Sequence, residues 1–217
     1  MEFTTKINIP KASFSITHQD KLLLLGSCFT ENIGHYLKQN QFQTNSNPFG
    51  IIYNPISIFG NLDNIIHHKI YQENDLLLHN ELYLSLDHHG QFSGTDKTEV
   101  LSTINSKITQ SNSDFISAKF IIITLGTAFV YTHLEQNRIV ANCHKIPNNA
   151  FEKRLLSIEE IKSSFNVIKD DLNDKIILFT VSPVRHWRDG AIENQRSKSI
   201  LIESIHQLIA ENKNCFY

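Results

Sequence analysis

Three short apolar runs interrupt an otherwise mixed chain, and polar or turn-forming residues bound each of them. They lie at Leu22–Leu25, Phe120–Leu125 and Lys175–Val181. Continuous apolar runs of this length are typical of strands that are buried on both faces, as in a parallel sheet covered by helices. We therefore predict three buried strands at these positions.

Longer stretches with helical spacing lie between and after these runs. Glu31–Gln39, Ser157–Leu172 and Ser199–Ile209 each carry apolar residues three and four positions apart, the spacing of an amphipathic helix. Strands that alternate with such helices predict βαβ units, and hence a parallel sheet with helices on both faces. The expected fold class is α/β.

Weaker signals surround this framework. A further strand is expected near Gln41–Asn45, followed by the turn-rich stretch NSNPFGIIYNP. Gln72–Gly94 and Tyr131–Ala141 depart from the alternation and are expected to form short antiparallel ribbons.

No linker rich in Gly, Ser or Pro divides residues 1–217, so we predict a single domain. The final ENKNCFY resembles the turn into another buried strand, and we expect the domain to be incomplete at its C-terminus.

The net charge, the apolar runs and the cysteine content argue against several classes of protein. The 217 residues carry a net charge of −2 and no dense Lys/Arg run, which disfavours nucleic acid and anionic membranes as partners. The N-terminus has no leader pattern, and no apolar run approaches the roughly 18 residues of a membrane span. A cytoplasmic location is therefore expected. Cys28, Cys143 and Cys215 are too few and too scattered for a disulfide framework and are expected to be reduced.

The first candidate functional residues directly follow the first predicted strand. They are Gly26, Ser27 and Cys28. In a parallel α/β sheet, ligands bind beyond the carboxyl ends of the strands. A serine there, at the start of a helix, has backbone N–H groups and the positive end of the helix dipole beside it, and both stabilise a developing oxyanion. Gly26 leaves room for a sharp bend. These features favour a nucleophilic Ser27.

Other interpretations of the same turn remain open. Ser27 could simply cap the following helix, and the sequence lacks the flanking glycine of a G-x-S-x-G elbow. Cys28 could be the nucleophile, although thiols near strand ends are usually inert packing residues. A phosphate-binding loop fits poorly, because the next glycine is Gly34 and no Gly-Lys-Ser/Thr follows.

Seven blocks in order carry a family resemblance across essentially the whole chain. They read GSCF, TENIG, NPFGIIYNP, HHGQFSGTDK, ITLGTAFVY, ANCHKIP and SPVRHWRDGAIENQRSKS. Together they resemble the GSCFA family, whose defining motif here ends in Thr30 instead of alanine. That family is similar to the SGNH/GDSL hydrolases, which have a flavodoxin-like, three-layer α/β/α fold and cleave esters with a serine nucleophile. The resemblance implies this fold and gives Ser27 the nucleophile role.

The resemblance carries over the remaining roles unevenly. The N–H groups of Cys28 and of Gly50, within the segment that begins at Asn47, would hold the oxyanion. The Gly-x-Asn-Asp block is replaced by Gly-Thr-Ala-Phe after the Phe120–Leu125 strand, so Thr127 or Asn142 would have to substitute for its asparagine. The closing Asp-x-x-His block of the superfamily, which supplies the general base, does not occur before Tyr217.

A serine hydroxyl needs a base at neutral pH, and the chain has 11 histidines. His186, which follows the third buried strand, is the first candidate, and His144 is the second. The adjacent pairs His67-His68 and His88-His89 point in different directions on regular structure, and neither has metal-ligand spacing, so no metal is expected. Asp87–His89 is expected to form a loop over the pocket, with a surface loop as the alternative.

We therefore expect a serine ester hydrolase, acylesterase- or deacetylase-like, or an acyltransferase that forms an acyl-enzyme on Ser27. Its substrate would be a small-molecule or glycan ester, and no cofactor is expected. The cluster Arg185–Asp189 could bind an anionic or sugar-like group or could be a solvated loop. The competing hypothesis is a non-catalytic small-molecule or carbohydrate-binding module, and a third is a thiol enzyme based on Cys28.

Overall fold

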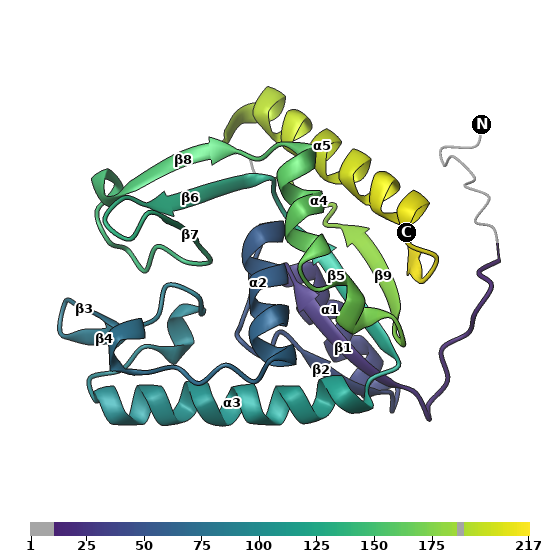
Figure 1. The fold of residues 1–217 in the computed structure, drawn as a ribbon, viewed down its shortest axis with the longest axis horizontal. Helices are drawn as coiled ribbons and strands as arrows, with labels where there is room; N and C mark the ends of the chain where they lie inside the picture. Colours follow the sequence, from purple (N-terminus) through teal and green to yellow (C-terminus); the bar gives the residue numbers. More distant parts are fainter. Residues whose placement is uncertain (1–10, 186–188) are drawn as a thin grey trace, which may run out of the picture.

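The computed structural model describes residues 11–185 and 189–217, and within them the core is a five-stranded parallel sheet (Figure 1). The strands lie side by side in the order β10–β9–β5–β1–β2. Their bounds are β1 Lys21–Gly26, β2 Gln43–Ser46, β5 Phe120–Leu125, β9 Ile176–Val181 and β10 Cys215–Phe216.

Counted along the chain, these five strands have the order 2-1-3-4-5, which is that of flavodoxin-like doubly wound sheets. The register places Gly26 opposite Thr124, and Thr124 opposite Thr180. The expected α/β fold is confirmed, and strands form at all three predicted runs. β1 and β5 are buried on both faces, whereas β9 is fully buried only at Ile177 and Phe179. Cys215–Phe216 pairs in parallel with β9, which confirms that a strand begins where ENKNCFY predicted one.

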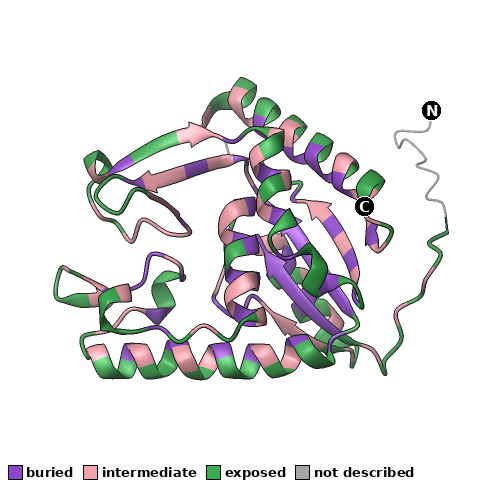
Figure 2. Cartoon of the chain, in the orientation of Figure 1, coloured by how far each residue is buried: buried purple, intermediate pink, exposed green. Residues whose placement is uncertain are grey.

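Helices cover both faces of the sheet, because alternate strand residues point to opposite sides. Leu22 and Leu24 pack with Ile33 and Leu37 of α1 (Cys28–Gln39). The other face packs against four helices, and Figure 2 shows the buried strands between the layers. These helices are α2 Pro55–Ile66, α3 Lys97–Ser117, α4 Ile158–Asn166 and α5 Gly190–Glu211.

Several boundaries differ from the predicted ones. The helix expected over Ser157–Leu172 ends at Asn166, and a short 3₁₀ turn, η4, covers Lys169–Leu172. The predicted strand at Gln41–Asn45 begins two residues later, because Gln41 adopts φ 66° in the turn that closes α1. Neither α2 nor α3 was among the predicted helices.

Two antiparallel excursions extend from the parallel sheet, as expected for Gln72–Gly94 and Tyr131–Ala141. One is a hairpin and the other a three-stranded ribbon in the order β7–β6–β8 (Figure 1). Their strands are β3 Leu77–His79, β4 Leu82–Leu84, β6 Phe129–His133, β7 Arg138–Val140 and β8 Phe151–Leu155, with 3₁₀ turns η1 Glu73–Asp75, η2 Gly90–Phe92 and η3 Asn148–Ala150.

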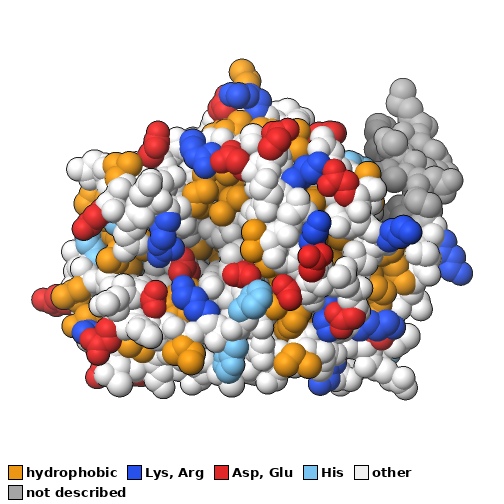
Figure 3. Space-filling model, viewed as in Figure 1, with side chains coloured by type: hydrophobic (Ala, Val, Ile, Leu, Met, Phe, Trp, Pro, Cys, Tyr) orange, Lys and Arg blue, Asp and Glu red, His pale blue; other side chains and the backbone are white. Residues whose placement is uncertain are grey.

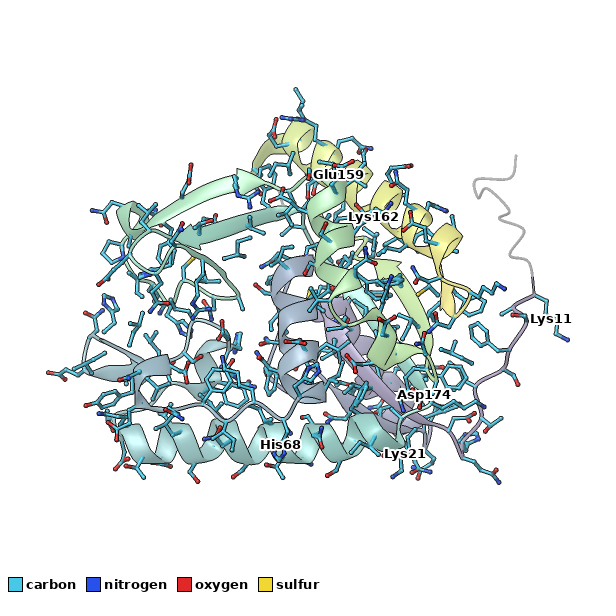
Figure 4. All side chains as sticks on the ribbon, viewed as in Figure 1. Lys11, Lys21, His68, Glu159, Lys162 and Asp174 are labelled. Carbon is cyan, nitrogen blue, oxygen red and sulfur yellow. The ribbon has the colours of Figure 1, made fainter. Side chains whose placement is uncertain are left out.

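The exterior carries charges of both signs. On the face shown in Figure 3, acidic and basic side chains are interspersed. Many of them pair locally; Lys162 on α4 reaches Glu211 of α5 at 2.6 Å (Figure 4). None of the helices in the described part of the chain has the length and apolar content that crossing a bilayer requires.

Candidate active site at the end of strand β1

Gly26 makes the turn that follows β1, and only glycine fits there. Its φ is 132°, and a Cβ atom at this position would lie 2.1 Å from the backbone oxygen of Thr124. The Gly26 N–H donates to Oδ1 of Asn47 at 2.9 Å, and its carbonyl accepts from the N–H of Ile52 at 3.0 Å. The turn is thus fixed by β5 on one side and by the segment after β2 on the other.

Ser27 occupies the N-cap position of α1, yet its side chain does not cap the helix. Its backbone N–H donates to the Thr124 carbonyl at 3.2 Å. The residue is 0% exposed, and its Oγ has no hydrogen-bond partner among the described residues. A capping serine would accept a bond from the first helical turn, so the interpretation of this hydroxyl as a helix cap is wrong. The hydroxyl sits instead beside the positive end of α1.

Asn47 carries a second buried polar atom without a partner. The residue has φ 45° and is 8% exposed. Because Oδ1 accepts from Gly26, the orientation of the amide is set, and Nδ2 is left without an acceptor in the described structure. A buried donor of this kind is costly unless something accepts from it. The amide of Asn47 is therefore a ready donor next to the Ser27 turn.

Gly50 lies in the same segment, but its N–H is already engaged. It donates to the carbonyl of Asn47 at 2.8 Å, and a Cβ atom at Gly50 would lie 2.2 Å from Cβ of His89. The His89 N–H in turn donates to the Phe49 carbonyl at 2.9 Å. The Asp87–His89 loop therefore lies directly on this segment, and His89 lines a cavity of about 300 Å³ together with Asn47 and Gly50.

The loop after β5 completes this edge of the sheet. The N–H groups of Gly126 and Thr127 both donate to the carbonyl of Tyr53, at 2.8 and 3.1 Å. The Thr127 hydroxyl lies 3.1 Å from the hydroxyl of Ser197 on α5 and accepts from the Phe129 N–H. Thr127 is thus at the expected edge, but its hydroxyl holds the loop onto α5.

Lys198 of α5 joins the ends of two strands at this edge. Its Nζ donates to the carbonyls of Gly126 at 2.6 Å and Ser182 at 2.8 Å. Burial lowers the pKa of Lys198, while the nearby Cys28 acts in the opposite direction through its charge. Burial also raises the pKa of Tyr53, and Cys28 adds to that rise. The charge of Cys28 therefore acts on both Tyr53 and Lys198.

His144 and Asn142 lie elsewhere. His144 Nε2 is 2.7 Å from the carbonyl of Ser85, its Nδ1 is 3.5 Å from Ser93 Oγ, and its backbone N–H donates to Asn142 Oδ1 at 3.0 Å. Burial lowers the pKa of His144. None of these bonds reaches the Gly26–Cys28 turn. His186, the other candidate base, lies outside the described residues.

His88 is the most enclosed histidine of the Asp87–His89 loop. Its Nδ1 is 2.8 Å from Ser85 Oγ, and its Nε2 has no partner in the described structure. The rings of Phe49, Tyr71 and Phe92 surround it with centroids at 4.8, 4.9 and 5.3 Å. Burial lowers its pKa to about 4; Asp87 opposes this shift, and Lys69 and His144 add to it. His88 is thus a neutral, packed residue.

Comparison with known proteins decides the family. The model of the GSCFA family matches residues 21–217. The chain belongs to the GSCFA family. Neither the curated proteins nor the solved structures contain a significant match to it.

In this GSCFA protein the family motif is the β1–α1 turn itself, from Gly26 to Thr30. The described residues contain no group of three or more His, Cys, Asp or Glu placed to bind a metal ion. Sequence reasoning missed Lys198 and assigned His89 only to a loop. Lys198 lies in the last of the seven blocks that carry the family resemblance, within the segment SKS at 197–199. Nothing in that segment indicates that the lysine contacts the end of β5.

Proposed function

We propose that this GSCFA protein is a serine ester hydrolase of the SGNH/GDSL type that works through an acyl-enzyme on Ser27. The observation that carries the proposal is the Ser27 hydroxyl, which is buried at the N-terminus of α1 and neither caps that helix nor bonds any other described group. A hydroxyl held without a partner where ligands bind in this fold suits a nucleophile that meets its partners in the substrate complex.

The chemistry assigns a task to each group at the turn. Ser27 Oγ forms a bond to the acyl carbon and gives its proton to a base, and the ester C–O bond then breaks so that the alcohol leaves with that proton. Water hydrolyses the acyl-Ser27 and releases the acid; a second alcohol in place of water would make the protein an acyltransferase. The substrate is a small-molecule or glycan ester.

Two donors are placed for the oxyanion that forms during attack. The Cys28 N–H belongs to the first turn of α1, where N–H groups have no acceptor within the helix. The second donor is the Asn47 amide, whose Nδ2 is buried and without a partner. We assign Asn47 this role in preference to Gly50, because the Gly50 N–H already donates to the Asn47 carbonyl.

The base is the part of the proposal that rests on sequence alone. His186 follows β9, whose carboxyl end lies on the same edge as Ser27, and it is the histidine that we assign to the Ser27 proton. His144, bonded to Ser85, would have to leave its present partners to serve as that base.

Labelling with a fluorophosphonate probe, followed by intact mass, tests the proposal. We expect one adduct per chain in the wild type and in the matched control Cys28→Ala, and none in Ser27→Ala. His186→Gln should slow labelling by roughly 100-fold, as expected for loss of a general base, whereas His144→Gln should not. Absence of an adduct on the wild type would instead favour the binding module, and inactivation of ester cleavage by Cys28→Ala would favour the thiol enzyme.

A further inference from the structure

Lys198 differs from an exposed lysine because it is partly buried and its ammonium group is bonded within the fold. It extends from α5 to the carboxyl edge of the sheet, where Nζ donates to the first carbonyls after β5 and β9, those of Gly126 and Ser182. Two of its three N–H donors are thereby used, and its side chain is partly buried.

The charge on this ammonium group is not neutralised by the protein around it. Both acceptors are neutral carbonyl groups, and no carboxylate within the described residues pairs with Lys198 at ion-pair distance. Elsewhere in the chain, partly buried lysines such as Lys162 do have a carboxylate partner. A partly buried cation without a counter-ion raises the electrostatic potential around it and favours negative charge nearby.

The register of the sheet brings this charge to the Ser27 turn. Gly26 pairs with Thr124, and the Ser27 N–H bonds the Thr124 carbonyl. Gly126, whose carbonyl accepts from Lys198 Nζ at 2.6 Å, lies two residues beyond Thr124 on the same chain segment. The charge of Cys28 acts to raise the pKa of Lys198, which agrees with a short separation between the two side chains.

We propose that Lys198 is the positive charge of the site and that it stabilises negative charge at the Gly26–Cys28 turn together with the N-terminus of α1. In the proposed esterase, on which this role rests, that charge is the oxyanion formed when Ser27 Oγ bonds the acyl carbon. Lys198 takes up no proton in this step. It acts through its field and through the two carbonyls that it holds, so it is a positioning residue with an electrostatic effect.

The thiol of Cys28 reports this field independently of any hydrolase activity, because Cys28 is partly exposed and only its thiolate reacts with iodoacetamide. The rate of alkylation of Cys28 is measured against pH by peptide mass in the wild type, Lys198→Gln and Lys198→Arg. In Lys198→Gln we expect alkylation of Cys28 to slow several-fold near pH 7, because a positive charge close to the thiol is lost. Lys198→Arg should retain the wild-type profile.

Cys143, which is also partly exposed, is the internal reference, and its profile should be the same in all three proteins. Lys198→Met provides a second neutral variant if Lys198→Gln does not fold, and thermal unfolding checks each protein. An unchanged Cys28 profile in a folded neutral variant would show that Lys198 only ties strand ends together and would overturn the proposal.

Fluorophosphonate labelling of the same variants separates this inference from the function on which it rests. If both hold, labelling of Ser27 falls by about tenfold or more in Lys198→Gln and is retained in Lys198→Arg. A shifted Cys28 profile without any Ser27 adduct in the wild type would leave the charge effect standing and remove the esterase. An unshifted profile with normal Ser27 labelling would do the reverse.

Discussion

Ser27 and His88 are both 0% exposed, and each carries a polar atom without a hydrogen-bond partner in the described part of the chain. Their surroundings differ in kind. Ser27 lies at the N-terminus of α1, where its N–H donates to the Thr124 carbonyl of β5, and we propose that the charge of Lys198 acts on this turn. His88 lies among three aromatic rings, and burial holds it neutral by lowering its pKa to about 4.

The comparison shows that a buried polar atom without a partner does not by itself indicate function. At His88 the apolar surroundings disfavour the charged form of the imidazole. The neutral ring packs against Phe49. At Ser27 the helix end and the lysine favour negative charge, which is what acyl transfer needs. The groups around the atom distinguish the two places: a helix N-terminus at Ser27 and three aromatic rings at His88.

The largest effect on stability is expected at Gly26, the residue before Ser27 in the turn. Gly26→Ala places a Cβ atom against the Thr124 carbonyl at a φ of 132°, and we expect a loss of about 3 kcal/mol or more in the free energy of unfolding. Gly60→Ala is the matched control, because a Cβ there meets nothing within 4 Å; inside α2 it should gain about 0.5–1 kcal/mol. Urea denaturation measures both. A tolerated Gly26→Ala would show that the turn is not rigid.

His88 should produce a smaller, pH-dependent effect. Its pKa is lowered from 6.5 to about 4 in the folded state, so the unfolded chain binds more protons between these values. Stability is therefore fully present above about pH 6.5 and falls as the pH drops toward 4, by about 3 kcal/mol at most. In His88→Phe this part of the pH dependence should disappear. Denaturation of both proteins at pH 7 and pH 5 measures it; equal losses in the two would refute the assignment.

The smallest effect separates Ser27 from an ordinary helix cap. Ser27→Ala removes a buried hydroxyl without a partner and should raise the free energy of unfolding by about 1 kcal/mol, even as it abolishes labelling. Ser157→Ala breaks the capping box of α4 and should lower it by about 1 kcal/mol. Thermal unfolding distinguishes the two signs. A loss at Ser27 similar to that at Ser157 would mean that its hydroxyl caps α1 in solution.

The parts of the fold that sequence predicted are those with a strong local pattern. The strands at Leu22–Leu25 and Phe120–Leu125 are continuous apolar runs because both faces of a parallel sheet are covered. α3 was missed although its buried residues Val100, Ile104 and Ile108 recur at helical spacing. Signals for its start and for that of α2 were present, since Asp96 and Asn54 each accept a bond from the first helical turn.

The place of the candidate site follows from the sequence, but the contacts around it do not. A strand followed by Gly-Ser at a helix start locates Ser27 from neighbouring residues alone. The bond from Gly26 to Asn47 and the reach of Lys198 to Gly126 join residues that lie 21 and 72 positions apart. Such contacts depend on how the strands assemble, and one sequence without its fold does not specify them. The predicted roles of His144 and His186 remain predictions.

The pairing of β1 with β5 has a consequence for synthesis of the chain. β1 pairs with β2 on one edge, but on its other edge Leu22 pairs with Phe120, about 100 residues later, and the entropy of closing that loop must be overcome first. A nascent chain that ends before β5 lacks the carbonyl that bonds the Ser27 N–H. The turn that carries Ser27 is therefore translated early and acquires its shape late, after β5 has left the ribosome.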